Sequence, residues 1–169
     1  SVNLTGASPY TSTLASTLPI IAEIGTVNIA GLGASNLNIS GNNGNFSVFT
    51  VASGGNLFIS GVTVSGAQTS GNGGAFNNSG TLAIANSTIS GNSASFGGGI
   101  YNSGTLTVSN SILNNNSTTT RGGGIFNGGT LTVSNSTLFT NSANHGAGIY
   151  NSGTATVTNS TLNNNTATN

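Results

Sequence analysis

Apolar and polar residues alternate with a period of two in short stretches that recur every 24 or 25 residues. In Thr105–Ser109, Leu106 and Val108 alternate with Thr and Ser, which is typical of a strand with one buried face. Gly, Asn and Ser bound each stretch, as turns require. A unit this short cannot bury its own apolar residues, so it must stack on its neighbours. The pattern therefore predicts a solenoid of short strands.

The repeat is nearly identical in three consecutive copies, which begin at Gly97, Gly122 and Gly146. The first copy reads Gly-Gly-Gly-Ile-Tyr-Asn-Ser-Gly-Thr-Leu-Thr-Val-Ser-Asn, and a looser copy begins at Gly73. Three short strands and three turns fit into each copy. We therefore predict an all-β parallel β-helix, or β-solenoid, of about six coils of 24–25 residues with three short strands per coil. Residues 26–169 form these coils, and residues 1–25 form an N-terminal segment that is either a cap or an inter-subunit strand.

The predicted strands fall at three positions of each coil. The first strands are Thr26–Ala30, Asn56–Ser60, Thr81–Ala85, Thr105–Ser109, Thr130–Ser134 and Thr154–Thr158. The second strands are 37–40, 62–65, 87–90, 111–114, 136–139 and 160–163. The third strands are 47–51, 74–76, 98–101, 123–126 and 147–150.

Stacking these coils predicts columns of like residues about 4.8 Å apart. Four columns are apolar and point inward: Leu57/Leu82/Leu106/Leu131/Ala155, Ile59/Ile84/Val108/Val133/Val157, Val64/Ile89/Leu113/Leu138/Leu162 and Val51/Phe76/Ile100/Ile125/Ile149. Two Asn columns are predicted at turns, where Asn tolerates left-handed backbone: Asn78/Asn102/Asn127/Asn151 and Asn86/Asn110/Asn135/Asn159. Runs such as Gly97-Gly98-Gly99 predict flexible, sterically open corners.

Composition excludes most classes of enzyme. The chain has 169 residues with one Glu (Glu23), one Arg (Arg121), one His (His145) and no Lys, Asp or Cys. A pair of carboxylates cannot form, and a Ser-His-Asp triad lacks its acid. We therefore predict that the protein is not an enzyme.

The same scarcity bears on cofactors and partners. One His without Cys cannot make a zinc site, and a calcium cage of carboxylates is absent, so no metal or cofactor is expected. One basic residue cannot neutralise a nucleic-acid backbone. No apolar run is long enough for a membrane span.

The Gly-Gly-Gly-Ile-Tyr-Asn-Ser-Gly-Thr-Leu-Thr-Val-Ser-Asn-Ser repeat resembles that of the polymorphic outer membrane protein family. So does the preceding Asn-Leu-Asn-Ile-Ser-Gly-Asn-Asn with Phe46 and Phe49, and the resemblance covers about residues 18–165. It implies a right-handed parallel β-helix that is secreted or displayed on a bacterial surface, often as an adhesin. The resemblance implies no catalytic residues.

Two outward columns are candidate binding faces. Thr105, Thr107, Thr130 and Thr132 form a Thr-x-Thr array that resembles the ice-binding face of antifreeze β-solenoids, although Thr is also an ordinary solvent-facing strand residue. Tyr101, Phe126 and Tyr150 form an aromatic column that is either an exposed strip for a surface glycan or a host or cell-surface ligand, or a partly buried corner stack. Arg121 and His145 stand one coil apart and could share an edge.

The two ends of the predicted solenoid look complementary. The final repeat runs to its second strand, and residues 18–24 read as a third strand ahead of the first coil. A second copy placed end-on would complete the last coil, and residues 1–17 are long enough to reach across the junction. The predicted subunit interface comprises Val2, Leu4, Leu14, Leu18, Ile20, Ala155, Val157 and Leu162.

These observations predict a secreted structural subunit whose partner is itself, in a head-to-tail homopolymer that forms an extracellular filament. A net formal charge of zero favours such association. The alternatives are a fragment or passenger of a bacterial surface adhesin and, third, an ice-binding β-solenoid.

Overall fold

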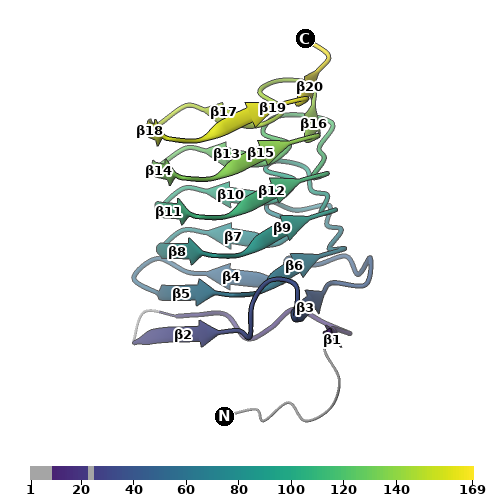
Figure 1. Cartoon of the computed structure of the whole chain (residues 1–169), viewed down its shortest axis with the longest axis vertical. Coiled ribbons are helices and arrows are strands. Elements are labelled where there is room, and N and C mark those ends of the chain that lie inside the picture. The colour runs from purple at the N-terminus through teal and green to yellow at the C-terminus, as the bar shows by residue number, and fades with distance from the viewer. Residues whose placement is uncertain (1–8, 23–24) are drawn as a thin grey trace.

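The computed structural model describes residues 9–22 and 25–169. It is an all-β parallel solenoid of about six turns, with three parallel sheets that run along its length (Figure 1). The predicted fold class and the number of coils are therefore confirmed.

Each turn contributes one strand to each sheet. The first sheet contains β2 (Thr26–Ala30), β5 (Asn56–Ser60), β8 (Thr81–Ala85), β11 (Thr105–Ser109), β14 (Thr130–Ser134) and β18 (Thr154–Thr158). The second sheet contains β1 (Tyr10–Thr13), β3 (Leu37–Ser40), β6 (Thr63–Ser65), β9 (Thr88–Ser90), β12 (Ile112–Asn114), β15 (Thr137–Phe139) and β19 (Thr161–Asn163). The third sheet contains β4 (Phe49–Val51), β7 (Phe76–Asn78), β10 (Ile100–Asn102), β13 (Ile125–Asn127) and β17 (Ile149–Asn151). β16 (Ser142–Ala143) pairs with β20 (Thr166–Ala167) at a corner.

The core is made of the predicted apolar columns. Register pairs Leu106 with Leu131 and Val108 with Val133, and Leu113 with Leu138, and all of these side chains are buried. The structure adds Val27 and Ile29 of β2 to the two columns of the first sheet. These columns fill the space between the three sheets because alternate residues of each strand point inward.

One apolar column is wrong by two residues at its first member. Phe49, not Val51, pairs with Phe76, and the two rings stack with centroids 5.1 Å apart. Val51 pairs with Asn78. A shift of two residues leaves the same side chains facing inward, so alternation alone cannot detect it.

The third strands also begin later than predicted. β10, for example, starts at Ile100 rather than at residue 98. The preceding Gly97 has a φ of 62°, and a Cβ on Gly98 would lie 2.3 Å from the carbonyl oxygen of Ser117. Both glycines are buried. The Gly runs are therefore closely packed corners, not the open ones that the sequence predicted.

The two predicted Asn columns have different roles. Asn86, Asn110, Asn135 and Asn159 have φ values of 47–48°, which confirms left-handed turn positions. Asn78, Asn102 and Asn127 are fully buried last residues of third-sheet strands, and each bonds across the following turn to the Gly two residues on. Their place beside a turn is as predicted, but none of them has left-handed backbone. The Nδ2 of Asn78 donates to the Oδ1 of Asn102 at 2.7 Å, and Asn102 donates to Asn127 at 2.7 Å.

A third Asn column was not predicted. Asn92, Asn116 and Asn141 are buried, and each Nδ2 donates to the Oδ1 of the next Asn, ending at Asn165, at 2.9–3.1 Å. Each Oδ1 of Asn116, Asn141 and Asn165 also accepts the backbone N–H of the preceding member. The column thus satisfies buried backbone and side-chain groups together.

Candidate functional surfaces

One end of the solenoid exposes its core columns. β18 and β19 are the outermost strands of the first and second sheets (Figure 1). Val157 is 43% exposed and Leu162 is 46% exposed, whereas Val133 and Leu138 one coil below are completely buried. Ala155 is exposed as well. Three of the predicted interface residues therefore lie on the last strands of the described sheets, whose outer edges have no partner among the described residues.

The opposite end carries an apolar pocket of about 580 Å³. Its lining includes Leu18, Ile20, Ile21, Val27 and Ile29. Ile20 is 61% exposed and Val27 is 40% exposed. The structure therefore places apolar surface at both ends of the described solenoid.

The N-terminal segment contributes to this second end. Ile21 pairs with Val51, and its N–H donates to the carbonyl of Thr50 at 2.9 Å, so one residue of the predicted third strand extends the third sheet. Leu14 is half-buried against the core. Val2, Leu4 and Glu23 lie outside the described residues. Tyr10–Thr13 lies in the segment predicted to be either a cap or an inter-subunit strand, and it pairs with β3 of its own chain.

The Thr array lies in register on the outer face of the first sheet. Thr105 pairs with Thr130 and Thr107 with Thr132, and all four side chains are exposed. Thr154 and Thr156 extend both columns by one row. In the two coils before Thr107, the same column is occupied by Ala83 and Phe58. The regular array is therefore only three rows deep.

We expect no thermal hysteresis from this face, because three rows of two threonines form a small array and Thr is an ordinary residue of a solvated strand. Nanolitre osmometry of the purified chain tests this, with the Thr107→Tyr/Thr132→Tyr double variant as its control. A hysteresis gap in the wild type that disappears in the double variant would contradict the expectation.

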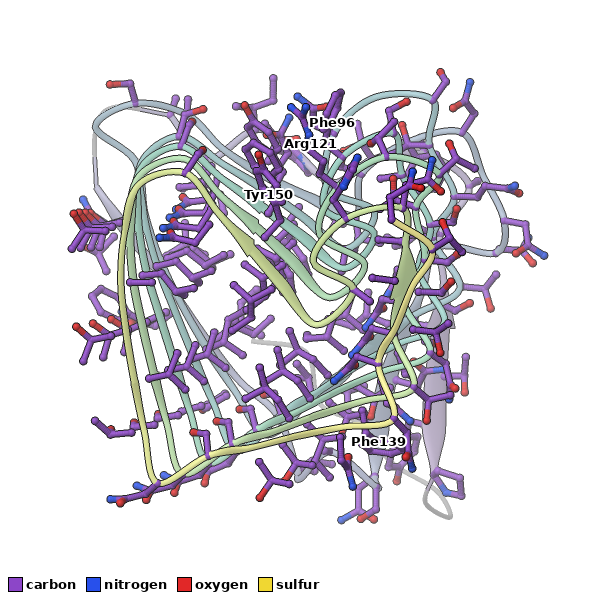
Figure 2. All side chains as sticks on the ribbon, turned by 90° about the horizontal axis from the view of Figure 1, so that it is seen from above. Phe96, Arg121, Phe139 and Tyr150 are labelled. Carbon is purple, nitrogen blue, oxygen red and sulfur yellow. The ribbon has the colours of Figure 1, made fainter. Side chains whose placement is uncertain are left out.

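The aromatic column is a half-buried stack on the third sheet. The rings of Tyr101 and Phe126 lie 5.0 Å apart and those of Phe126 and Tyr150 5.4 Å apart, both nearly parallel. Phe96 meets Phe126 edge-on at 5.7 Å. The Arg121 guanidinium lies 5.2 Å from the centre of the Tyr150 ring. Figure 2 shows Phe96, Arg121 and Tyr150 together on one side of the solenoid.

This arrangement supports the prediction of a partly buried stack, with one cation held against its end. Sequence reasoning missed the contacts of Phe96 and Arg121. Register could have revealed them, because Phe96, Arg121 and His145 form a bridged column beside the Gly corners. The predicted shared edge of Arg121 and His145 is thus confirmed by their bridge. The Arg121 guanidinium itself lies over the ring of Tyr150.

A polar groove of about 610 Å³ crosses several coils at another corner. Its lining includes Gln68, Ser93, Ser117 and Ser142, each of which is bridged to the next along the axis. Every lining residue is uncharged. Sequence analysis missed this groove, whose residues read only as turns.

The described residues contain no cluster of three or more His, Cys, Asp or Glu side chains that could hold a metal ion. No described segment is a helix of the length and apolarity needed to cross a membrane. The chain matches no protein-family model, no curated protein sequence and no solved structure. The solenoid fold implied by the resemblance is present, and no family is identified by these comparisons.

Proposed function

We propose that this protein is a structural subunit that stacks end to end on copies of itself to form an extracellular filament. The observation that carries the proposal is the match between the two apolar ends. Val27 and Ile29 begin the same inward columns that Ala155 and Val157 finish. A second copy placed on β18 would pair Ala155 with Val27 and Val157 with Ile29, and both columns would continue without a break.

Strand direction supports a head-to-tail contact. All strands within each of the three sheets are parallel. Translating one copy along the axis keeps every junction strand parallel to its new neighbour, whereas a head-to-head contact would reverse the strands and misalign the columns. Because the two contact surfaces differ, this junction does not close on itself and gives a filament.

Charge does not oppose the contact. The formal net charge is zero, and Arg121 and His145 are the only Lys, Arg, His, Asp or Glu residues in the described part of the chain. Copies of such a molecule do not repel each other at long range. The extracellular, bacterial location of the filament rests on the resemblance to the polymorphic outer membrane protein repeat.

The alternative function is that of a surface adhesin, for which the aromatic stack with Arg121 is the supporting observation. An aromatic face with a neighbouring cation can hold a sugar ring or a protein side chain. Monodisperse short rods that bind glycans through Tyr150 would favour this alternative over the filament.

The filament proposal is tested by negative-stain microscopy of the purified chain and of Val157→Asp. Wild type is expected to form long fibres. A buried valine contributes about 1.5–3 kcal/mol, and each 1.4 kcal/mol changes an equilibrium constant tenfold. Loss of that burial and introduction of a carboxylate are therefore expected to raise the critical concentration about 100-fold or more.

Thr156→Asp is the matched control, because Thr156 is the neighbouring residue on β18 and faces solvent in the column of Thr107 and Thr132. This variant is expected to assemble like wild type, and circular dichroism should show that both variants are folded. Wild-type protein that stays monomeric at millimolar concentration would rule out the filament.

A further inference from the structure

The three sheets do not contain equal numbers of strands. The first sheet has six strands, from β2 to β18, and the second has seven because β1 lies outside β3 (Figure 1). The third sheet has five strands plus the Ile21–Val51 bridge, which makes six levels. The second sheet is therefore one strand longer than the others.

This inequality constrains any end-to-end stack. Translation along the axis moves all three sheets by the same number of strand spacings. Continuous pairing of β18 with β2 of the next copy requires a shift of six spacings, and the third sheet fits this shift, with β17 beside the Ile21 segment. In the second sheet, however, β19 of one copy and β1 of the next would then occupy the same edge of β3.

The fit of β1 to this edge is imperfect. Register aligns Ser12 with Ile39, in a column whose later members are Val64, Ile89, Leu113, Leu138 and Leu162. Ser12 is exposed and Ile39 only half-buried. β19 would instead set Leu162 against Ile39. In the adjacent column β1 places Tyr10 beside Leu37, where β19 would bring Ser160, so the exchange within this sheet is nearly even.

The first and third sheets therefore decide whether the exchange of β1 for β19 is favourable. When β19 of one copy replaces β1 of the next, β18 pairs with β2 of that next copy over five residues and β17 lies beside its Ile21 segment. When β1 stays in place, neither of these pairs forms. β1 is also a short strand whose Thr11, Ser12 and Thr13 side chains are exposed. Its flanks are held by the hydrogen bonds from Tyr10 N–H to the Asn36 carbonyl at 2.8 Å and from Leu14 N–H to the Ser40 carbonyl at 2.9 Å.

We propose, on the basis of the end-to-end stacking above, that the edge of β3 is the docking site for β19 of a second copy. β1 covers this edge in the unassembled chain and leaves it when the neighbour docks. β1 is thus a removable cap, and its exchange for β19 gates assembly.

A disulfide that locks β1 in place tests this inference. Thr11 and Asn38 are paired in register, and the chain has no cysteine, so Thr11→Cys/Asn38→Cys introduces a single cross-link at this edge. Adjacent strands lie about 4.8 Å apart, within the Cα separation that a disulfide spans. The matched control is Thr63→Cys/Thr88→Cys, which cross-links β6 to β9 in the same column.

The oxidised lock variant is expected to lose fibre formation, with at least a tenfold fall in pelletable protein, and to regain it on reduction. The oxidised control should assemble in both states. The axial repeat of wild-type fibres, measured by cryo-electron microscopy or fibre diffraction, is expected to be six strand spacings, about 29 Å.

Two results would overturn the inference while leaving the filament intact. One is fibres of unchanged repeat from the oxidised lock variant. The other is a wild-type repeat of seven spacings, about 34 Å, which would mean that β1 stays in place. The repeat is measured on unmodified protein, so the test holds even where the lock variant fails to oxidise. Absence of fibres from wild type would overturn the filament and this inference together.

Discussion

Replacing Leu131 with aspartate is expected to abolish folding. Leu131 is 1% exposed in β14, the second strand from the end of the first sheet, and it lies between Leu106 of β11 and Ala155 of β18. A carboxylate there would lose its hydration and would have no cation to pair with, because Arg121 is the only Lys or Arg in the chain and it lies against Tyr150. The penalty of several kcal/mol is comparable to the whole stability of a small domain, about 5–15 kcal/mol.

The matched control is Thr132→Asp, one residue along the same strand. Thr132 faces solvent, so this carboxylate stays hydrated and the variant is expected to fold. Far-UV circular dichroism and size-exclusion chromatography of the two variants distinguish the outcomes. A soluble Leu131→Asp protein with the β-sheet spectrum of wild type would show that the strand register is wrong.

The second large effect is expected at the buried Asn column. The Asn116 Nδ2 donates to the carbonyl of Ile89 at 2.9 Å and to the Oδ1 of Asn141 at 3.1 Å. Its Oδ1 accepts the backbone N–H of Asn92 at 3.1 Å and the Asn92 Nδ2 at 3.0 Å. Asn116→Ala removes all four hydrogen bonds at a completely buried site and leaves the backbone N–H of Asn92 without its acceptor. An unsatisfied buried group costs about 1–3 kcal/mol, so we expect a loss of about 3 kcal/mol or more.

Asn115→Gly provides the comparison for this variant. Asn115 is exposed and has a φ of 55°, a conformation that Gly adopts freely, so its replacement is expected to cost less than about 1 kcal/mol. Guanidinium titration of both variants and wild type gives the shift in unfolding midpoint. Equal midpoints for Asn116→Ala and Asn115→Gly would mean that the ladder contributes little to stability.

The run Asn114-Asn115-Asn116 shows where sequence reasoning stops. The first Asn ends β12 and is half-buried, the second makes a left-handed turn, and the third enters the ladder through the core. Three identical residues thus have three different structural roles, because each role depends on the residue of the neighbouring coil that the side chain contacts. The ladder at Asn92 could not be separated from turn residues for this reason.

The apolar columns were predictable because a short repeat written several times fixes both the period and the partner. Leu106 and Leu131 occupy the same place in nearly identical sequence, and pairing follows. The prediction failed where the copies diverge. Phe49 lies in the least regular early coil, and the N-terminal strand Tyr10–Thr13 has no counterpart in the repeat. The candidate surfaces were located by column. The contact of Arg121 with Tyr150 was missed because the column of Phe96, Arg121 and His145 lies outside the predicted strands. The polar groove depends on side-chain positions that the repeat pattern does not specify.

The side-chain amides of the two Asn ladders form an aligned set of dipoles in a molecule with almost no charged residues. Each Nδ2 in both ladders donates toward the later coil, from Asn78 to Asn151 and from Asn92 to Asn165. The backbone dipoles of neighbouring sheet residues alternate and largely cancel, whereas these side-chain amides add along the axis. Chains of aligned hydrogen bonds also polarise one another. The solenoid thus carries an axial side-chain dipole with the same direction in both ladders, although its formal net charge is zero.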